Sequence, residues 1–151
     1  MATDLRLVES NPDERPVATL VDSNVILDIA TKDDQWGAWS REALRSARDR
    51  GRVIINPIVY AEVSVGYPSI EALDEVIPSA DFVREELPYV AGFLAGKAYL
   101  AYRKRGGNKR SPLADFYIGA HAATRSYRLL TRDSARYRTY FPTVELILPD
   151  G

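Results

Sequence analysis

The chain has 151 residues, of which 46% are hydrophobic and 27% are charged, and its formal net charge is -1. This length and composition are typical of a soluble, single-domain globular protein with a substantial core. The sequence contains no cysteine and one histidine, which excludes disulfide bonds and leaves too few ligands for a zinc site of the usual nitrogen and sulfur type.

The N-terminal segment shows no signal for secretion or membrane insertion. No apolar run approaches the ~20 residues that a membrane-spanning helix needs. Residues 1–16 are mixed in charge and lack an apolar stretch of signal-peptide length. We therefore predict an N-terminal tail over residues 1–16, one domain over residues 17–149, no membrane partner and a cytoplasmic location, which the absence of cysteine also fits.

Short apolar runs alternate with helix signals along the chain. The apolar runs predict strands at residues 17–21, 53–55, 128–130 and 144–148, with a small strand or extended link at 82–83. Helices are predicted from Ser23 as N-cap, over 35–50, from Asn56-Pro57 to about residue 66, over 69–77, over 88–105, from Ser111-Pro112 to about residue 126, and as a short turn or helix from Asp133. This alternation predicts a parallel sheet with helices on both faces.

Four acidic residues lie at separate turning points of this pattern. Asp22 ends the first predicted strand, and Asp133 follows the strand at residues 128–130. Glu62 and Asp115 lie on the apolar faces of two predicted helices. Ligands of open α/β sheets gather at the carboxyl ends of the strands, and carboxylates gathered there would need a hard cation. Metal-dependent phosphodiester chemistry is the first hypothesis.

Each acidic residue also has a local explanation. Asp22 and Asp133 fit turn or helix-cap positions, Glu62 fits a buried salt bridge or an amphipathic edge, and Asp115 fits the favourable field of a helix N-terminus. Three polar neighbours, Ser23, Asn24 and Thr131, would supply further oxygen-bearing side chains. The single histidine, His121, is on a different helix face from Asp115, and we interpret it as a packing or surface residue rather than a general base.

A basic segment lies near the end of the longest predicted helix. Five of the eight residues from 103 to 110 are basic: Arg103, Lys104, Arg105, Lys109 and Arg110. They are candidates for contacts with a nucleic-acid backbone. The alternative, which we weigh equally, is a solvated helix end where lysine and arginine complement the helix dipole.

Four segments in this order resemble PIN-domain ribonucleases, and within that superfamily the VapC-type toxins of bacterial toxin–antitoxin pairs. The segments are LVDSNVILDIA, INPIVYAEVSVGY, SPLADFYIGAHAATRSYRLLTRD and VELILP. The resemblance covers residues 17–149. Its strand-end Asp-(Ser/Thr)-Asn motif falls on Asp22, its helix glutamate on Glu62, its third acid on Asp115, and its Thr-x-Asp motif on Asp133.

The resemblance implies a three-layer α/β/α fold with a short, mainly parallel central sheet. It implies a Mg²⁺- or Mn²⁺-dependent endoribonuclease whose four acids hold the metal, supported by Ser23, Asn24 and Thr131. Many members of the family that act as toxins cut tRNA or rRNA in stem-loops and so arrest translation, and the resemblance implies such a substrate here. It further implies a homodimer and a cognate VapB-type antitoxin, for which Trp36, Trp39 and Tyr60 are candidate anchors.

Three other functions stay open. A housekeeping PIN nuclease acting in RNA processing would use the same acids. A catalytically silent PIN-like module would bind RNA or protein, although the presence of all four acids counts against it. A phosphotransferase with an aspartyl nucleophile would need a second acid near Asp22, where the sequence has Ser23 and Asn24.

Overall fold

The computed structural model describes residues 16–107 and 113–149. Nearly all of the predicted tail, the predicted helix start at Ser111-Pro112, and the candidate residues Lys109 and Arg110 lie outside the described residues. The five strands of the sheet are β1 (Thr19–Val21), β2 (Val53–Ile55), β3 (Val83–Arg84), β4 (Arg128–Leu130) and β5 (Leu146–Ile147). They are all parallel and lie in the order β3-β2-β1-β4-β5.

The central position of β1 decides where the chain places its polar side chains. Leu20 pairs with Ile54 of β2 on one side and with Leu129 of β4 on the other. The Asp22 amide then donates a hydrogen bond to the Leu130 carbonyl at 2.9 Å. Because the strands are parallel and in register, the residues that follow β1 and β4 leave the sheet side by side at its carboxyl edge.

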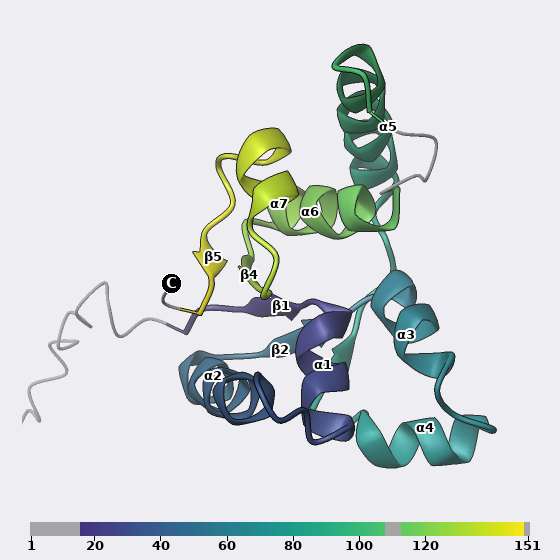
Figure 1. Ribbon diagram of the computed structural model, residues 1–151, viewed down its shortest axis with the longest axis vertical. Helices are drawn as coiled ribbons and strands as arrows, with labels where there is room; N and C mark the ends of the chain where they lie inside the picture. Colours follow the sequence, from purple (N-terminus) through teal and green to yellow (C-terminus); the bar gives the residue numbers. More distant parts are fainter. Residues whose placement is uncertain (1–15, 108–112, 150–151) are drawn as a thin grey trace, which may run out of the picture.

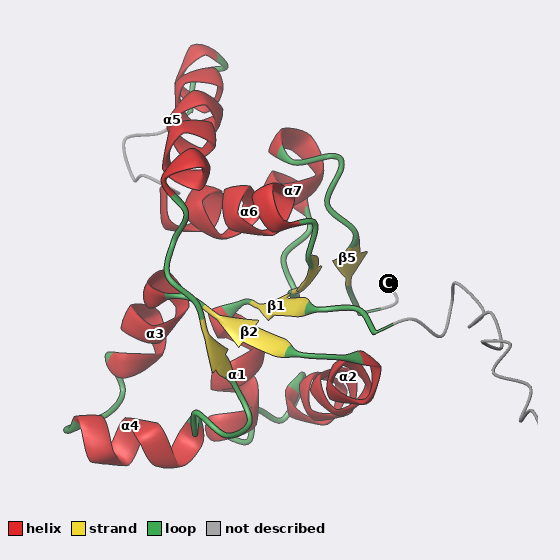
Figure 2. Ribbon diagram, turned by 180° about the vertical axis from the view of Figure 1, so that it is seen from behind, coloured by secondary structure: helices red, strands yellow, loops and turns green. Residues whose placement is uncertain are grey.

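Helices cover both faces of the sheet, as Figures 1 and 2 show. The helices are α1 (Ser23–Ala30), α2 (Gly37–Arg50), α3 (Pro57–Ser64), α4 (Ile70–Val76), α5 (Tyr89–Lys104), α6 (Leu113–Arg125) and α7 (Ala135–Tyr140). Helices α1 and α2 lie on one side of the sheet, and α6 and α7 lie on the other. The prediction of a three-layer α/β/α fold is therefore confirmed.

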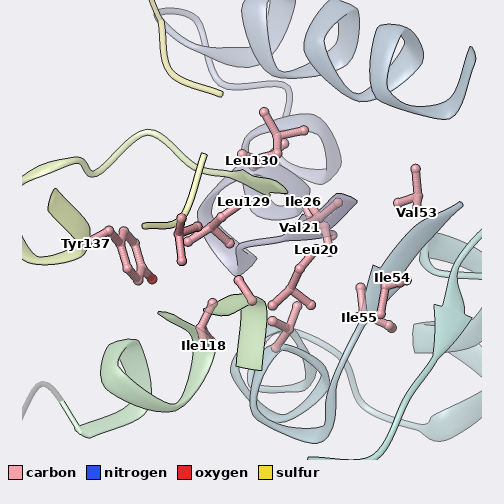
Figure 3. Close-up of a cluster of buried hydrophobic side chains, with 14 of the residues drawn as sticks. Leu20, Val21, Ile26, Val53, Ile54, Ile55, Ile118, Leu129, Leu130 and Tyr137 are labelled. Atoms are coloured by element: carbon pink, nitrogen blue, oxygen red, sulfur yellow. The ribbon is translucent and has the colours of Figure 1, made fainter. Parts of the chain in front are cut away.

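The core is formed by strands that are buried on both faces. Every residue of β1 and β2 is buried, as expected for a parallel sheet between two layers of helices. Figure 3 shows Leu20, Ile54 and Leu129 of neighbouring strands in one cluster of buried side chains with Ile118 of α6. Tyr137 of α7 joins this cluster and is only 1% exposed. Its ring belongs to the core while its hydroxyl serves a polar site.

Close packing fixes the layer of α5, α6 and α7. The Tyr102 ring of α5 meets the rings of Phe116 and Tyr140 edge to face, with centroid distances of 5.7 and 6.3 Å. Gly119 of α6 is needed for contact with Phe141, because a Cβ atom there would lie 2.4 Å from the Phe141 ring. Within the described residues, no helix combines the length and apolar character that crossing a membrane requires.

One helix start was predicted correctly and another was not. The Asn56 side chain accepts a hydrogen bond from the Val59 amide at 2.9 Å, and Pro57 is the first residue of α3, as predicted. The prediction that Ser23 caps α1 is wrong, because Asp22 is the N-cap and Ser23 is the first helical residue. The Ser23 hydroxyl faces the Asp22 and Glu62 carboxylates instead of a backbone amide.

Candidate active site

Asp22 is the centre of a polar cluster at the carboxyl edge of the sheet. Only 4% of its surface is exposed. Its Oδ2 atom accepts hydrogen bonds from the Thr131 hydroxyl at 2.8 Å and the Tyr137 hydroxyl at 2.9 Å. Thr131 directly follows β4 and Tyr137 belongs to α7. Two neutral donors from different elements thus hold one carboxylate oxygen of Asp22.

Ser23 connects Asp22 to the second acid. Its hydroxyl lies 3.1 Å from Glu62 Oε1 and 3.4 Å from Asp22 Oδ1. A hydroxyl has one proton to donate, so Ser23 can serve one of the two carboxylates at a time. This contact brings α3, which carries Glu62, to the start of α1.

Asn24 and Thr131 join the two neighbouring strand ends. The Asn24 amide nitrogen lies 3.4 Å from Thr131 Oγ1, and the Asn24 side-chain oxygen accepts from the Arg132 amide at 3.3 Å. Thr131 Oγ1 also accepts from the Asp133 amide at 3.1 Å. The three predicted supporting residues therefore all lie in the cluster and orient its central carboxylate.

Asp115, in the first turn of α6, is paired with an arginine. Arg136 Nη1 of α7 donates to Asp115 Oδ2 at 2.6 Å, and the side chains are 39% and 26% exposed. The pair lies at the open side of the cluster, whereas Asp22 lies at its buried side.

Burial and mutual repulsion change the proton affinity of these acids. Burial raises the pKa of Asp22, and the Asp115 charge adds to this increase, although the Thr131 and Tyr137 hydrogen bonds oppose it. Burial likewise raises the pKa of Glu62, helped by the charges of Asp22 and Asp115. Asp22 at the end of β1 and Glu62 of α3 are thus close enough to Asp115 of α6 for its charge to affect their ionisation.

Asp133 lies at the edge of this cluster. Its side chain is exposed, and its Oδ1 atom accepts a hydrogen bond from the Ala135 amide at 3.3 Å at the start of α7. This contact supports the local explanation of Asp133 as a residue that helps to begin a helix. Its charge still reaches the site, because it contributes to the raised pKa of Tyr137, although burial contributes most.

The donor set of the cluster fits a hard divalent cation. The oxygen atoms that it could offer to a metal belong to carboxylates, hydroxyls and an amide, which Mg²⁺ and Mn²⁺ prefer. The Arg136 guanidinium already places a positive charge on Asp115. In the described segments, no three acidic or histidine side chains are arranged as ligands of one metal ion. Direct coordination by three of them would need side-chain rotation.

The described part of the basic segment lies beside the site layer. Arg103, Lys104 and Arg105 are exposed at the end of α5. The Arg105 guanidinium carbon lies 5.6 Å from the centre of the Tyr140 ring in α7. The basic end of α5 is therefore next to the helix that carries Arg136.

Sequence reasoning missed several polar partners that the fold brings together. Arg136 and Tyr137 lie three and four residues after Asp133 of the Thr-x-Asp motif, and this proximity is the one sequence signal that could have found them. A second group joins Asp28 of α1 to Arg132, with distances of 2.5 and 2.9 Å, and to the Ser40 hydroxyl at 2.8 Å. This group of three residues links α1, α2 and the end of β4.

His121 is a packing residue, as predicted. It is fully buried, with Nδ1 at 3.0 Å from the Asn56 amide nitrogen and Nε2 at 2.9 Å from Glu85 Oε1. The Asn56 oxygen caps α3, so its amide nitrogen faces the ring and the ring proton lies on Nε2. His121 thus connects α6 to the start of α3 and does not face the acidic cluster.

A family model described as PIN domain matches residues 19–142. No curated protein sequence matches the chain significantly. Among solved structures, VapBC2 from Rickettsia felis bound to a DNA fragment from the promoter is similar, with a TM-score of 0.69 and 16% identity over 89% of this chain and 100% of that one. VapBC-1 from nontypeable Haemophilus influenzae has a TM-score of 0.65 and 15% identity over 87% of this chain and 97% of that one. A toxin-antitoxin complex from Klebsiella pneumoniae has a TM-score of 0.64 and 19% identity over 83% and 94%, respectively. At these identities the likeness concerns the fold.

Proposed function

The chain belongs to the PIN domain family, and we propose that it is a metal-dependent endoribonuclease toxin that a cognate antitoxin neutralises. The carrying observation is the convergence of Asp22, Glu62 and Asp115 from three separate elements, with burial and mutual charge raising the pKa of the first two. A fold that only needed local caps at these positions would not have to bring the three carboxylates together.

The proposed cofactor is Mg²⁺ or Mn²⁺. Asp22 and Asp115 are the proposed direct ligands, and Glu62 and Asp133 would contribute directly or through water. A divalent cation at this place supplies Lewis-acid chemistry, because it makes a water molecule more acidic and offsets charge that develops on the phosphate.

The residues of the chain prepare the site for this chemistry. The hydroxyls of Thr131 and Tyr137 fix the orientation of Asp22 through its Oδ2 atom. Glu62, whose Oε1 atom lies 3.1 Å from the Ser23 hydroxyl at the start of α1, would be placed to accept a proton from the attacking water at a carboxylate oxygen. Ser23 holds Glu62 at the site.

Structured RNA, such as tRNA or rRNA, is the proposed substrate. Arg103, Lys104 and Arg105, together with Lys109 and Arg110, would contact its phosphates. The position of Arg105 against Tyr140 supports this, because it directs the basic end of α5 toward the site layer. Replacement of Arg103, Lys104 and Arg105 by alanine should weaken RNA binding and reduce its salt dependence. An unchanged salt slope would exclude this role.

A VapB-type antitoxin is the proposed protein partner. The similarity in fold to proteins solved as VapBC and toxin-antitoxin complexes supports it. Trp36, Trp39 and Tyr60 are partly exposed and remain the candidate anchors. We further propose a homodimer through α5, because Tyr89, Phe93 and Leu100 are spaced along one helix face and are 98%, 66% and 47% exposed.

Cleavage of labelled RNA tests the proposed activity. The protein should cut RNA with Mg²⁺ or Mn²⁺ and not with EDTA. Asp22→Asn and Asp115→Asn should each lower the rate by at least about 100-fold, because a metal site contributes several kcal/mol to the transition state. Asp49→Asn is the control, since Asp49 is an exposed residue of α2 that pairs with Arg45. Full cleavage by either site variant would contradict the assignment.

Two further outcomes distinguish the alternative functions. RNA binding without cleavage under every metal condition would favour a silent PIN-like module. Cleavage without growth arrest on expression, and without a neighbouring antitoxin gene, would favour a housekeeping nuclease in RNA processing.

A further inference from the structure

Arg136 occupies a position that the proposed reaction does not yet explain. Among the described residues, Arg136 is the basic residue that forms an ion pair with one of the four acids of the site, Asp115. The other nearby arginine, Arg132, forms two hydrogen bonds to Asp28 and lies over the Trp36 ring at 5.2 Å. Arg132 therefore has a structural task, whereas Arg136 faces the site.

The fold determines where the Arg136 guanidinium points. Its neighbour Tyr137 is buried and bonded through its hydroxyl to Asp22, which anchors α7 at the site. The Arg136 side chain itself is 39% exposed. An arginine on an anchored helix with a partly solvated side chain can exchange one anionic partner for another by rotation about its own bonds.

Two cations compete for Asp115 in this arrangement. Arg136 Nη1 is 2.6 Å from Asp115 Oδ2. A divalent cation bound to this oxygen would therefore repel the Arg136 guanidinium. Once displaced, the guanidinium lies at the rim of an acidic cluster that would otherwise repel a phosphodiester. Its planar fork matches the geometry of phosphate oxygens.

We propose that Arg136 is an exchangeable counter-ion: a divalent metal displaces it from Asp115, and the released guanidinium then contacts a phosphate of the bound RNA. This inference rests on the proposed nuclease function and extends it to a residue outside the four acids. It makes Arg136 a substrate-contacting residue whose loss has opposite effects on metal binding and on RNA cleavage.

The first measurement is Mn²⁺ binding without RNA, by isothermal titration calorimetry or electron paramagnetic resonance. Arg136→Gln should bind Mn²⁺ about three- to tenfold more tightly than the wild type, because a competing cation is gone. Arg138→Gln is the matched control. Arg138 is exposed on the same short helix, and its replacement removes the same formal charge without freeing Asp115.

The second measurement is RNA cleavage at saturating Mn²⁺. Arg136→Gln should lower kcat/KM about tenfold or more, the usual effect of losing a hydrogen bond between charged partners. Arg136→Lys should recover part of the lost kcat/KM, because lysine keeps the positive charge but lacks the planar guanidinium that can bind two phosphate oxygens. Arg138→Gln should cleave like the wild type. Thermal unfolding of each variant checks that α7 keeps its place.

The outcomes separate this inference from the proposed function. Wild-type protein that binds no Mn²⁺ and cleaves no RNA would overturn both. If the wild-type protein cleaves RNA but Arg136→Gln has an unchanged Mn²⁺ affinity or an unchanged kcat/KM, only the role of Arg136 is overturned. Equal effects of Arg136→Gln and Arg138→Gln would also overturn it, because they would indicate a general effect of net charge.

Discussion

Asp22 and Asp28 provide a direct comparison of two buried carboxylates. Each is 4% exposed, and Asp22 is the N-cap of α1 while Asp28 lies within that helix. Asp28 is paired with the Arg132 guanidinium. Asp22 accepts hydrogen bonds from neutral hydroxyls, and no ion pair to it occurs within the described residues. Replacement of each by asparagine should therefore change stability in opposite directions.

The expected gain for Asp22→Asn follows from its pKa. Burial raises the pKa of Asp22, so the folded state binds a proton more tightly than the unfolded state. The ionised carboxylate then costs stability above the folded pKa, and this cost disappears as the pH falls below the unfolded pKa. The asparagine side chain in the variant still has one oxygen that can accept the hydrogen bonds from the Thr131 and Tyr137 hydroxyls. We expect a gain on the order of 1 kcal/mol at neutral pH, or about 2–4 °C in Tm.

The control variant Asp28→Asn should be destabilised. It leaves the partly buried Arg132 charge without its partner, a change that costs about 3 kcal/mol. Thermal unfolding in EDTA, at neutral pH and in mild acid, measures both effects. The stability gain of Asp22→Asn should shrink in acid. A lower Tm for Asp22→Asn at neutral pH, or a gain that does not depend on pH, would refute the reasoning about the buried charge.

Three further changes test other contacts. Tyr137→Phe removes a hydrogen bond that lowers the pKa of Asp22, so the acidic limb of the cleavage pH profile should move to higher pH; an unmoved limb would show that this bond does not tune the site. Gly119→Ala places a methyl group against Phe141 and should destabilise the protein by about 1–3 kcal/mol in urea titrations, whereas unchanged stability would mean that the ring moves freely. Asn56→Ala removes the side-chain cap of α3 and should lower the free energy of unfolding by about 1–2 kcal/mol in the same assay. A decrease of only a few tenths of a kcal/mol would show that this cap does not stabilise α3.

Local signals in the sequence were sufficient for several elements. The strands predicted at residues 53–55 and 128–130 match β2 and β4, because short apolar runs lie between clear helix signals. The Asn56-Pro57 start of α3 is confirmed for the same reason. The terminal strands were predicted too long: the run at 17–21 contains β1 at Thr19–Val21, and the run at 144–148 contains β5 at Leu146–Ile147. Apolar character extends past the paired residues there.

The site could be predicted only in part. Parallel strands with β1 in the centre place Asp22 beside Thr131, and this follows from strand order and register. The bonds from Tyr137 to Asp22 and from Arg136 to Asp115 depend on how α7 packs against α6, for which a helix of six residues carries no periodic signal. Asp133 was predicted as a full member of the cluster; its position at the edge follows from its contact with the start of α7, and its role as a metal ligand stays a prediction.

A crystal structure with bound Mn²⁺, located by its anomalous scattering, tests the central claim most directly. We predict a peak among Asp22, Glu62 and Asp115, with the Arg136 guanidinium turned away from Asp115. The contradicting result is a crystal with Mn²⁺ bound elsewhere or not at all, in which the Arg136–Asp115 pair and the hydroxyl contacts of Asp22 stay in place.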